Sequence, residues 1–313
     1  MKKYFSEFHH GMMFHRFHKN GTRPQGKGSV SEEKFEKIIK FIGIKNILSP
    51  EEWIFKLKKK ILKKTDVCLT FDDGLRSQFK YALPILKKYN LKAFWFVFSS
   101  VYENKIDENE LFNQLIFKKF KNTKIFQHKF LRDIKINTKV FKTKKYINYL
   151  VQNKKLYPIL TQEDIKYRFL RNIYFKRRDL IQIMNKFLDI KKKDHKDAIN
   201  IWMSKKQLKQ ISNEGHNIGL HSHSHDLEFK RLSEKKQTKE YKKNFNEIFK
   251  ITKIKPNAMS HPLNSYNKKT LRILKKLEII CGFRSNLNSF DYINKTDLEI
   301  ARNDPAYIFK YIN

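Results

Sequence analysis

Three residue types are scarce in this chain of 313 residues, which has 2 cysteines, 9 glycines and 7 prolines. The cysteines, Cys68 and Cys281, do not have the spacing of a zinc motif or of a disulfide framework. Cys68 lies in an apolar run, where a small buried thiol is the default interpretation. With so little glycine and proline, we expect no long flexible linker.

Long apolar runs are also missing. The sequence has no uncharged run of about 18 residues, so we expect no membrane-spanning helix. Its first residues, MKKYFSEFHHGMMFHRFHKNG, carry charge but no apolar segment of the kind found in secretory signals. Both observations predict a cytoplasmic protein.

Acidic residues are few. The chain has 31 Asp and Glu but 68 Lys and Arg, which gives a net charge of +37. Such a charge attracts nucleic acid, anionic lipid or acidic polysaccharide. The basic residues are mostly lysine and are spread along the chain with abundant Ile, Asn and Phe, as in the residue bias of an AT-rich genome. The sequence alone does not decide whether the charge serves an anionic partner or reflects this residue bias. We do not expect a nucleic-acid-binding protein, because no such motif is present and the lysines are not gathered in one segment.

The apolar pattern that is present predicts a globular α/β fold. Hydrophobic residues make up 40% of the chain. Strand-like segments at residues 11–17, 66–71 and 91–100 alternate with helix-like segments between them. This order favours a parallel sheet or barrel.

Residues 101–200 interrupt that alternation. They are rich in Lys, Asn and Phe, helical in pattern, and contain no convincing strand. The segment SKKQLKQISNEGHNIGLHSHSH then restores a helix, a short strand and a polar loop, and further helices and short strands follow. We therefore predict one domain over residues 1–313 with a mainly helical insertion at 101–200.

The first chemically suggestive motif is LTFDDG. Two adjacent carboxylates, Asp72 and Asp73, end a buried strand and precede Gly74. In parallel α/β folds this end of a strand is where active sites are built. Neighbouring strand residues point to opposite faces, so the chain must leave the strand for both carboxylates to converge. An Asp-Asp-Gly turn with solvated acids is the alternative interpretation.

The second motif is GLHSHSHDL, in which His221, His223 and His225 alternate with serines. Two neutral imidazoles and one carboxylate form a common metal site with positions open for water and substrate. The spacing of His221 and His225 suits a shared ion, but the cluster alone leaves the choice among its three rings open. A polar surface loop is the alternative.

Together, TFDDG and HSHSH resemble the polysaccharide deacetylase superfamily, also called the NodB-homology domain. MMFHRF, GHNIGLHSH and SHPLNSYNKKTLRILKKLEI are similar to further family segments, and the resemblance covers roughly residues 11–100 and 200–302. It implies a distorted (β/α) barrel that uses a divalent metal, most often zinc, to remove acetyl from N- or O-acetylated sugars. It also implies Asp73, His221 and His225 as metal ligands and Asp72 as the general base. His223 then becomes a bystander.

Two family features differ in this chain. The third motif reads Ser-His-Pro-Leu-Asn from residue 260, with Leu263 where the family has tyrosine and uses that residue's backbone N–H to hold an oxyanion. The C-terminal Leu-x-His that supplies a general acid is absent. His261 as the acid and Arg302 as the residue that orients Asp72 are the candidates. These differences keep a second hypothesis open, a catalytically impaired barrel that binds glycan.

The substrate that this resemblance and the charge imply is an acetylated sugar inside the cell, such as a sugar nucleotide, a lipid-linked glycan or a surface-polysaccharide precursor. A basic surface suits each of these anionic molecules and also peripheral contact with a membrane.

Overall fold

The protein is described from a computed structural model, which defines residues 8–24, 26–157, 160–285 and 296–312. These residues form two compact units. Unit 1 comprises Met1–Thr22, Gly28–Lys105 and Ile199–Asn313, and unit 2 comprises Arg23–Lys27 and Ile106–Ala198. Unit 2 therefore occupies most of the segment expected to be an insertion.

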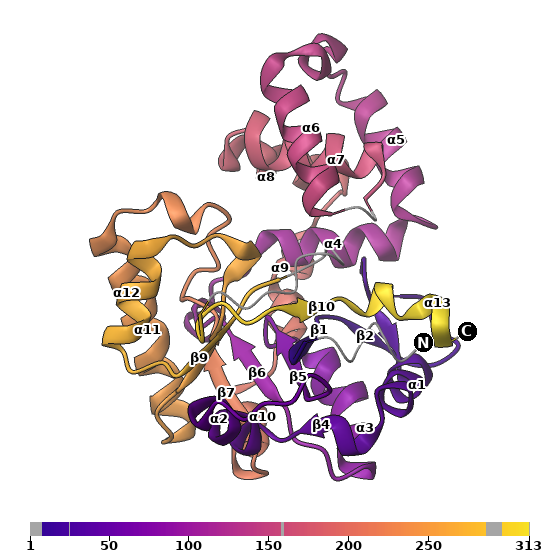
Figure 1. Cartoon of the computed structure of the whole chain (residues 1–313). Coiled ribbons are helices and arrows are strands. Elements are labelled where there is room, and N and C mark those ends of the chain that lie inside the picture. The colour runs from indigo at the N-terminus through magenta and orange to yellow at the C-terminus, as the bar shows by residue number, and fades with distance from the viewer. Residues whose placement is uncertain (1–7, 25, 158–159, 286–295, 313) are drawn as a thin grey trace. The chain divides into compact units, whose positions relative to one another are not determined.

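Unit 1 is built on a parallel sheet (Figure 1). The strands along its main path have the order β10-β1-β5-β6-β7-β8-β9, and β4 pairs with the beginning of β5. A parallel bridge between Phe283 and Ile300 joins β9 to the residues that lead into β10, so the sheet nearly closes into a barrel. The bounds of the strands are β1 His10–Phe14, β4 Ile47–Leu48, β5 Val67–Asp72, β6 Phe94–Val97, β7 Asn217–Leu220, β8 Ala258–Ser260, β9 Cys281–Phe283 and β10 Arg302–Asn303. A separate small sheet pairs β2 Phe17–His18 with β3 Val30–Ser31.

The sheet is buried on both faces, which explains why its strands are nearly all apolar. In β6, Phe94 and Phe96 belong to one apolar cluster, and Trp95 and Val97 belong to the other. The first cluster also contains both cysteines and the buried Trp53, Ile54 and Leu57 of α2, the helix that closes the end of the barrel where the strands begin (Figure 1).

The helices of unit 1 begin largely where the sequence provides caps. Ser49 starts α2 with a capping box, and Ser31 and Ser233 cap α1 and α11. The bounds are α1 Glu32–Ile42, α2 Pro50–Lys59, α3 Leu83–Lys88, α10 Lys205–Asn213, α11 Glu234–Thr252, α12 Lys268–Lys276 and α13 Phe309–Ile312.

One expected helix contains an irregular turn. Residues 77–90 have a helical pattern, but a π-helical turn at Gln78–Ala82 precedes α3. Pro84 has no N–H to donate and its ring crowds the carbonyl of the preceding turn, which accounts for the irregular hydrogen bonding.

Unit 2 consists of helices joined by short loops, and its described residues contain no strand. Its helices are α4 Glu108–Lys119, α5 Thr123–Asp133, α6 Lys144–Leu156, α7 Gln162–Phe169, α8 Arg177–Phe187 and α9 Lys192–Ala198. Phe126 and Phe130 of α5 pack edge-on against Tyr167 of α7, and these rings form much of the core of unit 2. Within the described part of both units, no helix has the length and apolar character that a membrane span requires.

Candidate active site

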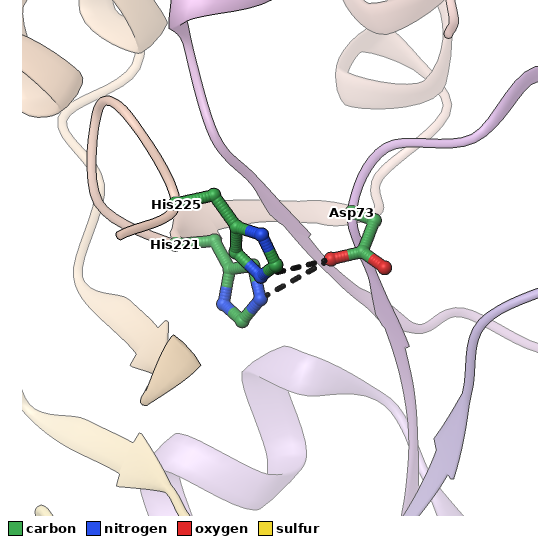
Figure 2. Close-up of side chains that lie close together, drawn as sticks. All are labelled: Asp73, His221 and His225. Carbon is green, nitrogen blue, oxygen red and sulfur yellow. Dashed lines mark ion pairs between the residues drawn. The ribbon is translucent and has the colours of Figure 1, made fainter. Parts of the chain in front are cut away.

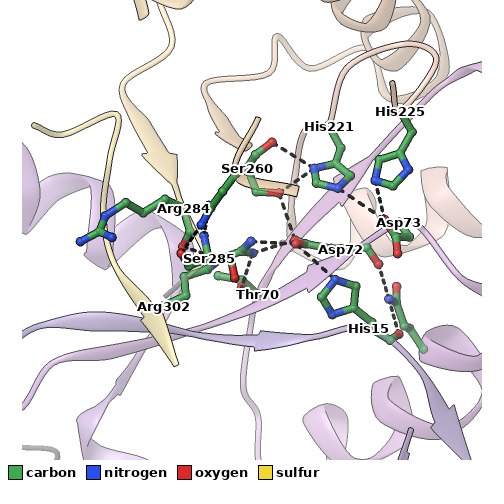
Figure 3. Close-up of polar contacts among 12 residues, drawn as sticks. His15, Thr70, Asp72, Asp73, His221, His225, Ser260, Arg284, Ser285 and Arg302 are labelled. Atoms are coloured by element: carbon green, nitrogen blue, oxygen red, sulfur yellow. Dashed lines mark hydrogen bonds and ion pairs between the residues drawn. The ribbon is translucent and has the colours of Figure 1, made fainter. Parts of the chain in front are cut away.

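The paired carboxylates lie where β5 ends. Asp72 is the last residue of the strand, and Asp73 and Gly74 both have left-handed backbone, with φ of 74° and 64°. Aspartate tolerates this conformation better than most residues, and glycine adopts it freely. The bend brings both carboxylates to the same end of the barrel (Figure 3). They are buried there, with exposed fractions of 2% and 7%.

Arg302 holds the carboxylate of Asp72 from the neighbouring part of the sheet. Its Nη1 donates to Oδ1 at 2.7 Å and its Nη2 donates to Oδ2 at 2.8 Å, a two-pronged ion pair (Figure 3). Nη1 also donates to the hydroxyl of Thr70, and Nε donates to the carbonyl of Arg284. The guanidinium is 1% exposed, so its position is fixed by contacts and not by solvent.

Gly11 makes room for that arginine. β1 pairs with β10 so that Gly11 lies opposite Arg302. A Cβ on Gly11 would lie 3.0 Å from Cγ of Arg302, which is closer than ordinary packing allows. The missing side chain lets the arginine stem run along β1 toward Asp72.

The histidine loop follows directly on β7. His221 comes after the last strand residue, and Ser222 and His225 have left-handed backbone, with φ of 61° and 53°. The hydroxyl of Ser222 accepts the N–H of His225 at 3.1 Å and closes the turn. The ring of His225 also stacks on Phe98 at 5.1 Å. The loop thus folds over itself and places two rings side by side.

These two rings meet Asp73. Nε2 of His221 lies 3.4 Å from Oδ1 of Asp73, and Nε2 of His225 lies 3.5 Å from the same oxygen (Figure 2). One ligand atom from each residue can be chosen so that all three lie within 4.8 Å of one another. Oδ1 of Asp73 is buried and makes no hydrogen bond. Such an oxygen facing two imidazole nitrogens is suited to a cation.

The separations fit a small divalent ion. Zinc binds imidazole nitrogen and carboxylate oxygen at about 2.0–2.2 Å, so two ligands of a tetrahedral site lie roughly 3.4 Å apart. The two distances from Oδ1 of Asp73, 3.4 and 3.5 Å, agree with that spacing. Three ligands leave a position for water and substrate, as in catalytic sites.

Ser260, at the end of β8, connects the two groups of residues. Its hydroxyl donates to Oδ1 of Asp72 at 3.1 Å and lies 2.7 Å from Nδ1 of His221. Its carbonyl lies 3.0 Å from the same Nδ1. These contacts fix the ring of His221 so that Nε2 faces Asp73, the orientation that ligand histidines need.

Electrostatics keeps both carboxylates ionised. Burial raises the pKa of Asp72, but the charges of Arg302 and His221 outweigh it and the net pKa lies below the ordinary value. Burial likewise raises the pKa of Asp73, but the close approach of His221 and the charge of His225 bring the net pKa well below the ordinary value.

His223 lies apart from this cluster. Its Nδ1 is 2.9 Å from the hydroxyl of Ser99, and its Nε2 is 3.5 Å from Glu103. Its backbone N–H donates to Glu240 of α11 at 3.2 Å. The ring is therefore turned away from Asp73 and anchors the loop to its surroundings.

Two other residues selected from the sequence do not join the cluster. His261 is 1% exposed, places Nε2 at 2.7 Å from the carbonyl of Leu298, and stacks on Tyr266 at 3.9 Å. Burial lowers the pKa of His261 to about 3. Leu263 has left-handed backbone with φ of 52° and a 44% exposed side chain. Among the described residues, no hydrogen bond or ion pair joins either one to Asp72 or Asp73.

Sequence reasoning did not select His15 and Ser260 as site residues. His15 follows β1, and its Nε2 lies 3.8 Å from Oδ2 of Asp72 with 32% of the side chain exposed (Figure 3). Both residues belong to segments that the family resemblance already marks, MMFHRF and SHPLN. A search of each segment for polar residues at a strand end would have found them.

Comparisons with known proteins concern the sequence family and the fold. The sequence model described as "Polysaccharide deacetylase" matches residues 59–122 and 151–281. No curated protein sequence matches the chain. Three solved structures serve as examples of a similar fold.

The first is the deacetylase PplD of Streptococcus pyogenes in complex with acetate, with 17% identity, coverage of 97% of both chains and a TM-score of 0.53. The second is a de-N-acetylase from Aggregatibacter actinomycetemcomitans, with 13% identity, coverage of 97% of this chain and 99% of that one, and a TM-score of 0.58. The third is IcaB from Ammonifex degensii, with 13% identity, coverage of 95% and 91%, and a TM-score of 0.53. At these identities the likeness concerns the fold.

Proposed function

The chain belongs to the polysaccharide deacetylase family, and we propose that it is a metal-dependent hydrolase that removes acetyl groups from an acetylated sugar. One observation carries the proposal. A carboxylate held by an arginine, Asp72, stands beside a cluster of one carboxylate and two imidazoles whose ligand atoms lie within 4.8 Å. Metal-assisted hydrolysis of an amide or ester uses both parts, a general base and a site for a metal ion that acts as a Lewis acid.

Asp73, His221 and His225 are the proposed ligands of a divalent ion, with zinc the best match to two imidazoles and one carboxylate. The chemistry that such an ion supplies is a lowered pKa for water and polarisation of the acetyl carbonyl.

Asp72 is the proposed general base. Arg302 donates one hydrogen bond to each of its carboxylate oxygens, and Ser260 donates a second one to Oδ1. A lone pair of Oδ2 is therefore left to accept the proton of the attacking water. Because the positive charge of Arg302 disfavours the protonated carboxyl, Asp72 gives this proton up readily once the tetrahedral intermediate has formed.

His15 is the proposed carrier of that proton to the leaving nitrogen. It lies on the Oδ2 side of Asp72 and keeps about a third of its side chain exposed, with an exposed fraction of 32%. In this role the neutral ring accepts the proton from Asp72, whose Oδ2 lies 3.8 Å from its Nε2, and then donates a proton to the leaving nitrogen. The contacts of His261 favour a structural role instead.

Leu263 is proposed to act through its backbone N–H, which would donate to the oxyanion of the tetrahedral intermediate. The exposed leucine side chain does not take part in this donation. The substrate we propose is an anionic acetylated sugar or glycan precursor, since the net charge of +37 attracts such molecules.

The test is release of acetate from a panel of N- and O-acetylated sugars and glycans by the purified chain, with bound metal measured in parallel. We expect acetate release that stops on chelation and returns with zinc. The variant Asp72→Asn should retain the metal and lose activity by about 100-fold or more.

The same variant distinguishes the second hypothesis, a barrel that only binds glycan. The intact ion pair between Asp72 and Arg302 favours turnover, because a binding protein does not need an oriented base. If neither form releases acetate and both bind glycan equally, the binding hypothesis holds and the enzyme hypothesis fails.

A further inference from the structure

The outward face of α6 in unit 2 carries two apolar side chains that nothing in the described structure covers. Val151 is 63% exposed and Ile147 is 48% exposed. They are four residues apart, so they lie one above the other on the same side of the helix. Tyr146 and Asn153 are buried on the opposite side, where Tyr146 packs edge-on against Phe169 of α7. The fold therefore fixes which side of α6 faces outward.

Lysines surround this apolar pair. At about 100° per residue, Lys144 and Lys155 lie on the same side as Val151, and Lys154 lies next to Ile147. Together with Lys145 these lysines are exposed. The surrounding sequence, residues 134–162, contains seven lysines and no acidic residue. We call Lys144, Ile147, Val151, Lys154 and Lys155 the α6 face, and we include Lys145 as its rim, about 80° around the helix from Lys155.

We propose that the α6 face docks on the surface of an anionic phospholipid bilayer. A helix with apolar residues along one line and lysines on either side lies in the plane of the lipid head groups, with the apolar side chains reaching the acyl boundary. Each lysine near such a surface adds attraction to the lipid phosphates. The two kinds of contact act together, which is what stable peripheral binding requires.

Two other partners fit this face less well. Nucleic acid would use the lysines, but its phosphates gain nothing from Ile147 and Val151 at the centre of the face. A second copy of the chain, joined through a two-fold axis, would bring the same lysines against each other without an acidic residue between them. The bilayer uses both the charge and the apolar residues.

The first test uses the full chain and sedimentation with vesicles of phosphatidylcholine, with and without phosphatidylglycerol. We expect binding only to the vesicles that contain phosphatidylglycerol. The combined substitution Lys144→Gln, Lys145→Gln, Lys154→Gln and Lys155→Gln should weaken it by about tenfold or more.

A matched control removes the same charge elsewhere. Lys235, Lys236, Lys239 and Lys242 are exposed on α11, and three of them line a lysine-rich hollow of about 550 Å³. Replacing these four by glutamine should leave most of the vesicle binding. An equal loss in both variants would mean that only the overall charge matters and would overturn the proposal. Circular dichroism of each variant verifies that the chain is folded.

The second test concerns the apolar pair. Ile147→Asn with Val151→Asn keeps the charge and should weaken vesicle binding several-fold, while leaving any binding to duplex RNA unchanged. Vesicle binding that persists at full strength in this variant would contradict the proposal, as would a change in its oligomeric state measured by light scattering.

Insertion of the α6 face into the bilayer can be measured directly. Cys68 and Cys281 are buried, so a Val151→Cys variant offers an accessible thiol for an environment-sensitive dye. The emission should shift to the blue on addition of phosphatidylglycerol vesicles and stay unchanged with phosphatidylcholine alone. The absence of a shift on bound protein would overturn insertion of the α6 face.

Discussion

The guanidinium of Arg302 binds both carboxylate oxygens of Asp72, at 2.7 and 2.8 Å, although the two residues are 230 positions apart in the sequence. This pair sets the direction in which Asp72 presents its free lone pairs. In the proposed mechanism Arg302 is a positioning residue, since it acts through Asp72.

The first prediction concerns this pair. Arg302→Lys supplies one point charge and cannot bind both oxygens, so we expect kcat for acetate release to fall about 10- to 100-fold, with bound metal retained. The pKa of Asp72 should rise, because the paired guanidinium that lowers it is replaced by a single, less well placed charge. The acidic limb of the pH–rate profile should then move to higher pH. A profile that does not move would assign Arg302 a purely structural role.

Arg302→Met serves as the comparison. It leaves the buried carboxylate of Asp72 without its partner, and we expect the free energy of unfolding to fall by about 3–5 kcal/mol. Urea denaturation measures this change.

The second prediction separates the three histidines of the loop. His221→Ala and His225→Ala each remove one of the proposed ligands, so most of the bound metal should be lost. His223→Ala removes a ring held by Ser99 and Glu103 and should retain the metal. Metal analysis after gel filtration gives the answer. Loss of metal in His223→Ala with retention in His225→Ala would reverse the proposed ligand set.

The third prediction concerns His15. If it carries the proton from Asp72 to the leaving nitrogen, His15→Gln should lower kcat about 100-fold while the metal content stays the same. Two residues on one proton path are not additive, so adding His15→Gln to Asp72→Asn should cause little further loss. Full activity in His15→Gln would show that Asp72 returns the proton by itself.

The fourth prediction is a dependence of stability on pH. His216 is buried before β7, and its Nδ1 accepts the N–H of Ala93 at 3.0 Å, which requires an unprotonated nitrogen. Burial, with a smaller contribution from the charge of Lys92, lowers the pKa of His216 to about 4 in the folded protein from an ordinary 6.5. Between these values the unfolded chain binds a proton that the folded chain does not.

The free energy of unfolding should therefore fall as the pH is lowered from about 6.5 to about 4, by up to about 3 kcal/mol for this residue. Urea denaturation at several pH values should give a flatter dependence for His216→Gln. The exposed His128 provides the control, since His128→Gln should leave the dependence as it is in the unmodified chain. If the free energy of unfolding depended on pH equally in the unmodified chain, His216→Gln and His128→Gln, the assignment of this dependence to His216 would be wrong.

Much of the fold followed from local patterns. The strand at residues 66–71 and the helix after Ser49 lie where they were expected, because burial periodicity and capping residues act over a few positions. The π-helical turn before Pro84 was not expected, since the helical pattern of apolar residues continues through it. The change in composition at residues 101–200 predicted an insertion within one domain, whereas the assignment of Arg23–Lys27 to unit 2 depends on tertiary contacts.

By itself the sequence determined the local features of the candidate site. It provided the carboxylate pair Asp72 and Asp73, with a glycine to bend the strand, and the His221 and His225 spacing, because these features lie within single turns of chain. Only the tertiary structure decided their partners. The register of β1 with β10 brings Arg302 to Asp72 past Gly11, and the pairing of β7 with β8 brings Ser260 to His221. Strand pairing between distant segments sets such contacts, and no local pattern records which residues it will bring together.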